Sequence, residues 1–296
     1  MMYFNAEYNK RIEIANDIIK SYIPIDLGVK SDIIKAMKYS LMAGGKRIRP
    51  ILIMEMAKKF NYDYDKISPF MAAIEFIHTY SLVHDDLPAM DNDDYRRGKL
   101  TTHKKYGHAM GILAGDALLN YAFEILISSL KEFENKDEAI NAMEVLARNA
   151  GVGGMIGGQA CDVINDGKEI DEDTILYIYE NKTSALIEAS MVIGAILGGA
   201  NEDEISDIED AGSLIGMAFQ IKDDILDIEG DEEKLGKPLH SDEANNKTTY
   251  VTINGLEKSK NTVDDYMKEA KEILDNVGCK NEFLEELLNY LVYREN

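Results

Sequence analysis

Two aspartate-rich motifs hold the residues of this chain whose types and spacing could do chemistry. The first, at 81–91, contains Asp85, Asp86 and Asp91, and the second, at 219–227, contains Asp223, Asp224 and Asp227. Each motif borders an apolar helical segment, where carboxylates are costly unless they are paired or bound to metal. The chain has 54 acidic residues, so paired aspartates arise by chance. Two such motifs in one helical chain nevertheless predict two carboxylate clusters around a polyanion.

The carboxylates are oxygen ligands with no cysteine nearby, a set that suits Mg²⁺. Residues four apart share a helix face, which predicts one polar stripe along the second motif from Gln220 to Asp227. Pro88 interrupts the first helix and should let Asp91 fold back beside Asp85. We therefore predict several Mg²⁺ ions per active site, held by Asp85, Asp86, Asp91, Asp223 and Asp227. Magnesium bound this way keeps positions open for phosphate oxygens.

The overall charge restricts the partners of such a site. Net charge is −22 and the sequence pI is about 4.6, which disfavours nucleic acid and anionic lipid over most of the surface. Anionic substrates would need locally placed cations. Basic residues do lie beside glycine turns and beside both acidic motifs, namely Lys46, Arg49, Arg96, Arg97, Lys182 and Lys237. His78, two helical turns before Asp85, could contact a phosphate or could be an ordinary core histidine.

The rest of the chain must position these residues, and its patterning predicts helices. Hydrophobic residues make up 45% of the 296, only 5 are proline, and no segment alternates as strands require. Helical spacing covers 70–86, 111–131, 174–197 and 205–228, several of them apolar nearly all round. We predict an all-α fold, a single large helical bundle in one domain spanning 1–296. The apolar stretch 189–200 is too short to cross a bilayer and should be a buried helix.

Three smaller features complete the prediction. The glycine cluster at 151–158 lacks the lysine of a P-loop, which favours close helix packing over a phosphate loop. Cys161 and Cys279 have no metal-ligand spacing, and the N-terminus has no apolar signal region. We therefore expect a cytoplasmic protein with no membrane span.

The combination of motifs resembles the polyprenyl synthetase family of trans-prenyltransferases, and within it the bacterial farnesyl diphosphate synthases. The resemblance rests, in the family's order, on segments 44–50, 78–98, 157–159, 182–183, 219–227 and 231–238. It implies an all-α fold of the isoprenoid synthase type with the aspartate motifs facing across a central cavity. It also implies a homodimer and the head-to-tail condensation of isopentenyl diphosphate with dimethylallyl or geranyl diphosphate, giving farnesyl diphosphate.

The resemblance also implies roles for individual residues. Isopentenyl diphosphate would be held by Lys46, Arg49, His78 and Arg97. The allylic diphosphate would be held by Arg96, Lys182, Thr183, Gln220 and Lys237. Oxygens of Lys182, Thr183 and Gln220 would stabilise the allylic cation, while Asp85, Asp91 and Asp223 would lead the metal binding.

Product length is implied by the residues just before the first motif. Tyr80 would form the floor of a hydrophobic tunnel, and Ser81 is too small to block it. At about 100° per residue, Tyr80 lies roughly 140° from Asp85 on a helical wheel. The resemblance rather than the wheel therefore places Tyr80 in the tunnel, and plain core packing is the alternative.

Other functions explain fewer of the motifs. A His-Asp metal phosphohydrolase, suggested by His84 beside Asp85, would need a histidine cluster and would leave the second motif idle. A terpene cyclase would leave Lys46, Arg49 and Arg97 without purpose, and a non-catalytic subunit would not need intact motifs. The nearest alternative is a geranylgeranyl diphosphate synthase on the same fold.

Overall fold

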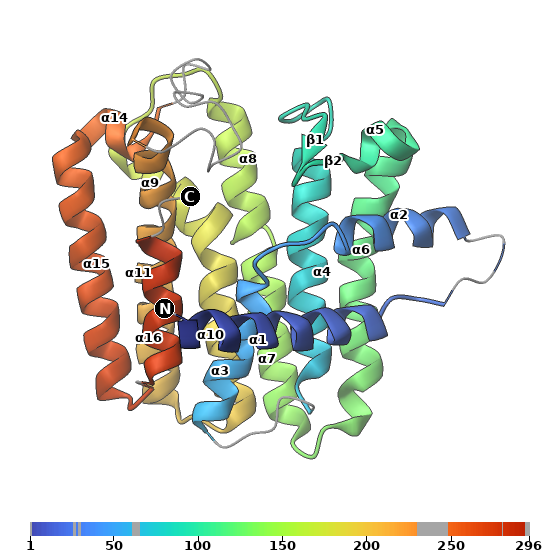
Figure 1. Ribbon diagram of the computed structural model, residues 1–296, viewed down its shortest axis with the longest axis horizontal. Coiled ribbons are helices and arrows are strands. Elements are labelled where there is room, and N and C mark those ends of the chain that lie inside the picture. The colour runs from blue at the N-terminus through green and yellow to red at the C-terminus, as the bar shows by residue number, and fades with distance from the viewer. Residues whose placement is uncertain are drawn as a thin grey trace.

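Helices make up nearly all of the regular structure, as the spacing of apolar residues predicted (Figure 1). The computed structural model of the chain describes residues 2–25, 28, 31–60, 66–229, 248–279 and 281–293. In chain order the helices are α1 (Met2–Ser21), α2 (Ser31–Leu41), α3 (Ile48–Lys59), α4 (Ser68–Asp85), α5 (Thr102–Tyr106), α6 (His108–Ser129), α7 (Lys136–Ala150), α8 (Met155–Asn165), α9 (Glu172–Ile178), α10 (Ala185–Gly198), α11 (Glu202–Glu229), α14 (Tyr250–Asn254), α15 (Leu256–Asn276) and α16 (Glu282–Val292). A short hairpin, β1 (Tyr95–Arg96) and β2 (Lys99–Leu100), and two short helical turns, η1 (Leu130–Glu132) and η2 (Tyr179–Ser184), complete the described elements.

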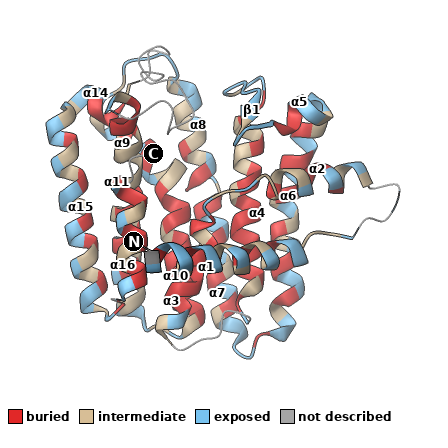
Figure 2. Cartoon of the chain, viewed as in Figure 1, coloured by how far each residue is buried: buried red, intermediate tan, exposed pale blue. Residues whose placement is uncertain are grey.

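The most apolar helices lie at the centre of the bundle. α10 is buried from Ala185 to Leu197 except at Glu188, and α4 is buried from Pro69 to Ile77 (Figure 2). α10 packs against α3, α7 and α11, while α4 packs against α6 and α3. A helix that is hydrophobic all round has to be enclosed in this way, because every face must leave water. The predicted buried helix at 189–200 is confirmed.

The segment predicted as one helix at 174–197 is interrupted. A π-helical turn, η2 (Tyr179–Ser184), separates α9 from α10 and contains Lys182 and Thr183. A π turn inserts an extra residue into a helix, which re-aims the side chains and carbonyls around it. Its wider hydrogen-bond spacing leaves no trace in apolar periodicity, so the sequence prediction of an uninterrupted helix was wrong here.

The glycine cluster at 151–158 serves helix packing, as predicted. A Cβ atom on Gly154 would lie 2.2 Å from the carbonyl oxygen of Asn149, and one on Gly158 would lie 2.3 Å from the backbone nitrogen of Lys182. Both contacts are far shorter than a side chain tolerates. Gly158 therefore lets α8 touch the backbone of η2, next to predicted site residues.

One described helical stretch, His108–Glu132, is long and apolar enough to cross a membrane by length and composition. It comprises α6 and η1, and α6 packs against α4, α2 and α5 inside the bundle. Only 39% of its most apolar window is buried. The helix thus keeps an apolar outer face.

Candidate active site

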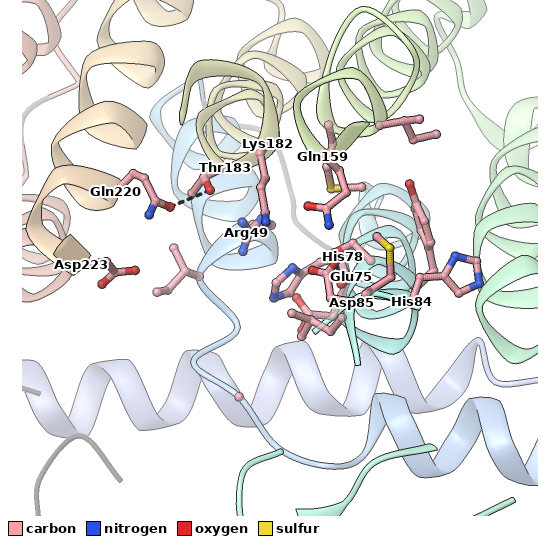
Figure 3. A pocket seen from close by; sticks show the side chains of 18 of the residues that line it. Arg49, Glu75, His78, His84, Asp85, Gln159, Lys182, Thr183, Gln220 and Asp223 are labelled. Atoms are coloured by element: carbon pink, nitrogen blue, oxygen red, sulfur yellow. Dashed lines mark hydrogen bonds between the residues drawn. The ribbon is translucent and has the colours of Figure 1, made fainter. Parts of the chain in front are cut away.

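A cavity of about 1000 Å³ opens between the start of α3, the last turns of α4, α8, η2 and α11 (Figure 3). Predicted site residues that line it are Lys46, Arg49, His78, Tyr80, Ser81, Asp85, Arg97, Lys182, Thr183, Gln220 and Asp223. Predicted site residues that do not line it are Asp86, Asp91, Arg96 and Asp227. Lys237 lies outside the described residues. Segments more than 170 residues apart in the chain thus meet around one space.

The first motif ends α4 and then turns back on itself. The backbone N–H of Asp91 donates to the carbonyl oxygen of Asp85 over 2.9 Å, so the two aspartates lie side by side, as Pro88 predicted. Asp85 lines the cavity, while Asp91 is exposed and does not line it. Burial raises the pKa of Asp85 to about 6, an effect that nearby Lys182 opposes and nearby Asp91 reinforces. A carboxylate pair held this way would gain from a bound cation.

Asp86 faces away from the cavity. Its carboxylate accepts a hydrogen bond from Nε of Arg96 over 2.7 Å, and Asp86 is 3% exposed. Both residues line a smaller neighbouring hollow behind α4 instead. Asp86 was predicted to bind metal and Arg96 to bind phosphate, but the structure pairs them with each other. Adjacent residues on a helix differ by about 100°, which puts Asp85 and Asp86 on different faces.

The second motif divides in the same way. Asp223 and Gln220 line the cavity from α11, whereas Asp224 and Asp227 are buried elsewhere, at 5% and 2% exposed. The Asp224 carboxylate accepts hydrogen bonds from the hydroxyl of Tyr179 and, over 3.2 Å, from the backbone N–H of Tyr250. At about 100° per residue, Gln220, Asp223, Asp224 and Asp227 share one side of α11, as predicted, but only Gln220 and Asp223 line the cavity.

Arginine side chains converge at one end of the cavity with a neutral histidine. Burial lowers the pKa of Arg49 to about 10, an effect that Glu75 opposes, and Arg49 remains charged. Burial first, and then the positive charges of Arg49 and Arg97, hold the pKa of His78 well below its usual value. Within the described part of the chain, Nε of Arg49 is buried with no hydrogen-bond partner. An arginine with an unsatisfied Nε next to a neutral histidine is suited to an incoming anion.

A tight turn brings Arg97 to this end. β1 and β2 pair with Arg97 and Gly98 between them, and both have positive φ angles, 53° and 72°, as a two-residue hairpin turn requires. The Arg97 guanidinium donates to the carbonyl oxygen of Gly44. A Cβ on Gly45 would lie 2.6 Å from Nη1 of Arg97, so glycine at 45 is what lets the guanidinium approach.

A buried ion pair that was not predicted from the sequence stabilises the arginine-rich end of the cavity. Nη1 of Arg47 lies 2.5 Å from Oε1 of Glu75, with both side chains almost fully buried, and Nε of Arg47 donates to Asn16 over 2.9 Å. The pair joins the loop before α3 to α4 and α1. Glu75 also lines the cavity beside the arginines. Helical spacing puts Glu75 one turn before His78, which was the available signal.

The opposite wall carries Lys182 and Thr183 on the π turn. Nζ of Lys182 lies 2.6 Å from a carboxylate oxygen of Asp162 on α8, and Asp162 was not predicted from the sequence. The Thr183 hydroxyl donates to the side-chain oxygen of Gln220 over 2.8 Å (Figure 3). This bond uses the hydroxyl proton, so lone pairs of the Thr183 oxygen remain to face positive charge in the cavity.

Apart from Gln159, the lining from α8 is apolar. α8 contributes Met155, Ile156, Ala160, Val163 and Ile164. From α4, Tyr80 lines the same space and is 6% exposed, and Ser81 donates its hydroxyl proton to the His78 carbonyl. The cavity therefore combines a charged region with a hydrocarbon-like region, as an amphiphilic substrate would need.

Comparisons with known proteins agree with this architecture. The family model described as "Polyprenyl synthetase" matches residues 30–291. The farnesyl diphosphate synthase of Geobacillus stearothermophilus is 43% identical over 88% of this chain and 88% of its own. The large subunit 1 of the chloroplastic heterodimeric geranylgeranyl pyrophosphate synthase of Arabidopsis thaliana is 40% identical over 97% of this chain and 78% of its own.

Among solved structures, the geranyltransferase of Helicobacter pylori complexed with magnesium and isoprenyl diphosphate superposes with a TM-score of 0.82. It is 31% identical, covering 97% of this chain and 96% of the other. The family match covers most of the chain, and the sequence and structural relatives agree with it. This chain belongs to the polyprenyl synthetase family.

Proposed function

We propose that the chain is a magnesium-dependent farnesyl diphosphate synthase, a single-domain prenyltransferase that condenses isopentenyl diphosphate with dimethylallyl and then geranyl diphosphate. The observation that carries the proposal is the division of the cavity. Asp85 and Asp223 face it from two walls, distinct cation sets flank them, and apolar side chains line the remainder. Two diphosphates and one growing hydrocarbon chain need these three features together.

The residues present suit Mg²⁺. Asp85, Asp91 and Asp223 offer hard oxygen ligands, which Mg²⁺ prefers. Among the described residues, no three histidine, cysteine, aspartate or glutamate side chains are already placed to hold a metal ion. This arrangement fits ions whose coordination is completed by water and substrate phosphate. When bound, Mg²⁺ neutralises the charge that develops on the departing diphosphate.

Protein groups hold the substrates on either side of these carboxylates. Lys46, Arg49 and Arg97 bind isopentenyl diphosphate, with neutral His78 as a further hydrogen-bonding group. Lys182 binds the allylic diphosphate, after exchanging its ion pair with Asp162 for one with phosphate. Lys237 is proposed for the same role from the sequence alone. Arg96 remains paired with Asp86 and supports the site from behind.

The reaction then follows from where charge develops. As the allylic carbon–oxygen bond breaks, the carbonyl of Lys182 and the oxygens of Thr183 and Gln220 lie on the wall that faces the cation. The double bond of isopentenyl diphosphate attacks this cation, and a proton leaves to the departing diphosphate. Apolar residues of α8 keep out water that would otherwise capture the cation. Tyr80 limits the chain to fifteen carbons by closing the apolar end, next to the smaller Ser81.

Diphosphate release tests the condensation. We expect release only when an allylic diphosphate, isopentenyl diphosphate and Mg²⁺ are all present, with two diphosphates released per farnesyl diphosphate formed from dimethylallyl diphosphate. Release from the allylic substrate alone would indicate a cyclase or a hydrolase. Full turnover after exhaustive chelation with EDTA would contradict the metal assignment.

We also propose that the enzyme is a cytoplasmic homodimer that binds no nucleic acid. Support for the dimer comes from the outer face of α6, where Ile112, Leu113 and Ile127 are 41%, 54% and 61% exposed. Ile140 of α7 is 45% exposed as well. Leu113→Glu with Ile127→Glu should halve the mass measured by light scattering, while Ile253→Glu on α14 should not. A wild-type monomer would contradict the proposal.

A further inference from the structure

His84 lies against the residue proposed to limit product length. Tyr80 and His84 are four residues apart on α4, so they share a helix face. Their ring centroids are 5.7 Å apart at an interplanar angle of 81°, an edge-to-face contact. Both side chains line the cavity. The sequence predicted no role for His84 in prenyl transfer.

The backbone of α6 fixes the His84 ring. Its Nε2 lies 3.1 Å from the carbonyl oxygen of Ile112, and a carbonyl can only accept, so Nε2 carries the proton and donates. The carboxylate of Asp116 lies 3.8 Å from the same nitrogen. A hydrogen bond from Nε2 to the neighbouring helix α6 thus holds the His84 ring in place. The same ring packs against Tyr80.

A glycine on α6 makes room for the ring. A Cβ on Gly115 would lie 2.0 Å from Nε2 of His84 and 2.2 Å from its Cδ2. No side chain at 115 is compatible with this ring position. The His84 ring therefore fills a notch in α6 that exists only because residue 115 is glycine.

His84 does not point toward the charged groups that bind diphosphate. Figure 3 shows its ring turned away from Lys182, Arg49 and Asp223, although the next residue is Asp85. Its Nε2 already donates a hydrogen bond to the Ile112 carbonyl oxygen. A role in metal or phosphate binding is therefore not supported by the direction of the ring.

We propose that His84 is a positioning residue for product length: it holds the Tyr80 ring across the apolar end of the cavity. This inference rests on the proposed function. A phenol ring stops a growing chain only if it cannot rotate aside, and a packed neighbour restricts that rotation. The edge-to-face contact with His84, itself locked between Ile112 and Gly115, supplies that restraint.

The test measures the ratio of twenty-carbon to fifteen-carbon product, which does not depend on the total rate. With dimethylallyl and excess isopentenyl diphosphate, His84→Ala should raise the ratio at least tenfold. Gly115→Ala should raise it too, because the methyl group displaces the ring. His84→Gln, whose amide nitrogen can reach the Ile112 carbonyl, should give an intermediate ratio. Gly111→Ala is the matched control on α6, since its methyl group would meet His103 and Leu87 rather than His84.

A double variant tests whether His84 acts through Tyr80. Tyr80→Ala should raise the ratio, and adding His84→Ala to it should change the ratio less than twofold. The Mg²⁺ concentration for half-maximal turnover should stay within twofold of wild type in His84→Ala, because the ring does not serve the metal.

Each contrary outcome has its own meaning. If wild type makes farnesyl diphosphate and both His84→Ala and Gly115→Ala keep the wild-type ratio, the positioning role is wrong while the proposed function stands. If Tyr80→Ala and His84→Ala lengthen the product additively when they are combined, His84 does not act through Tyr80. If wild type forms no prenyl diphosphate, the proposed function fails and takes this inference with it. His84→Ala and Gly115→Ala perturb the contact from opposite helices, so misfolding of one leaves the other to decide.

Discussion

The two aspartate motifs look alike in sequence but are built differently. The first lies where α4 ends, and the chain curls back so that Asp91 rests beside Asp85. The second lies within the continuous helix α11, where Asp223, Asp224 and Asp227 keep ordinary helical spacing. In each motif one aspartate lines the cavity, while Asp86 and Asp224 bind protein groups instead. Aspartates of one motif therefore have different roles. Some face the cavity, and others stabilise the surrounding structure by binding protein groups.

The largest expected effect separates these two classes. Asp85→Ala and Asp223→Ala should each lower kcat/KM by about 10³-fold or more, since each removes a ligand from the metal that stabilises the leaving group. Asp265→Ala, in the exposed acidic pair on α15, should stay within twofold of wild type. Thermal melts should show both cavity variants folded. Unfolded variants would mean that these aspartates are structural.

The next effect sharpens the division between the two substrate sites. Arg49→Ala should raise KM for isopentenyl diphosphate about tenfold or more while changing KM for geranyl diphosphate less. Lys182→Ala should do the reverse, because it lies on the opposite wall with Asp162. Removing a charge-assisted contact of this kind costs about 1.5–3 kcal/mol. Steady-state kinetics with each substrate varied in turn provides the measurement, and equal effects on both substrates would contradict the assignment.

A smaller effect tests the buried half of the second motif. Tyr179→Phe should lower the free energy of unfolding by about 1–3 kcal/mol, because the buried Asp224 carboxylate loses a donor. Tyr177→Phe, two residues earlier and 44% exposed, is the matched control. Chemical denaturation of both variants provides the comparison. If Tyr179→Phe is as stable as the control but loses activity, the network around Asp224 serves chemistry rather than the wall.

The smallest effect concerns the cost of keeping Asp85 charged. Its pKa is about 6 in the fold against an ordinary value of 3.8, so the folded chain holds a proton that the unfolded chain has released. The free energy of unfolding therefore falls as pH rises from about 3.8 to about 6, and the full destabilisation is present above pH 6. Without Mg²⁺, Asp85→Asn should stabilise the protein by about 1–2 kcal/mol at pH 7.5. The gain should shrink toward pH 5, as melts across that range would show. A pH-independent difference would contradict the raised pKa.

Much of the fold was predictable because it depends on periodicity. The apolar positions of α4, α6, α10 and α11 repeat over many turns, and their burial follows from that pattern. The π turn at η2 was not predictable, because it alters hydrogen bonding rather than composition. Nor was the hairpin at Tyr95 to Leu100, which is too short to show alternation.

The site was predictable where charge density identified it and unpredictable where partners come from distant segments. Asp85, Asp223 and Arg49 stand out by type and spacing. Asp162 was missed because its partner Lys182 is 20 residues away and meets it only through the approach of α8 to η2 at Gly158. The pairing of Asp86 with Arg96 was missed because the sequence does not distinguish an aspartate that pairs with an arginine from one that binds a metal ion.

The central claim is tested most directly by the length of the product. Purified wild-type protein would be incubated with dimethylallyl diphosphate, excess isopentenyl diphosphate and Mg²⁺, and the dephosphorylated products separated by chromatography. We expect farnesol, which is fifteen carbons long, as the main species. Geranylgeraniol as the main species would contradict the proposed floor at Tyr80, and the absence of any prenyl alcohol would contradict the proposed synthase.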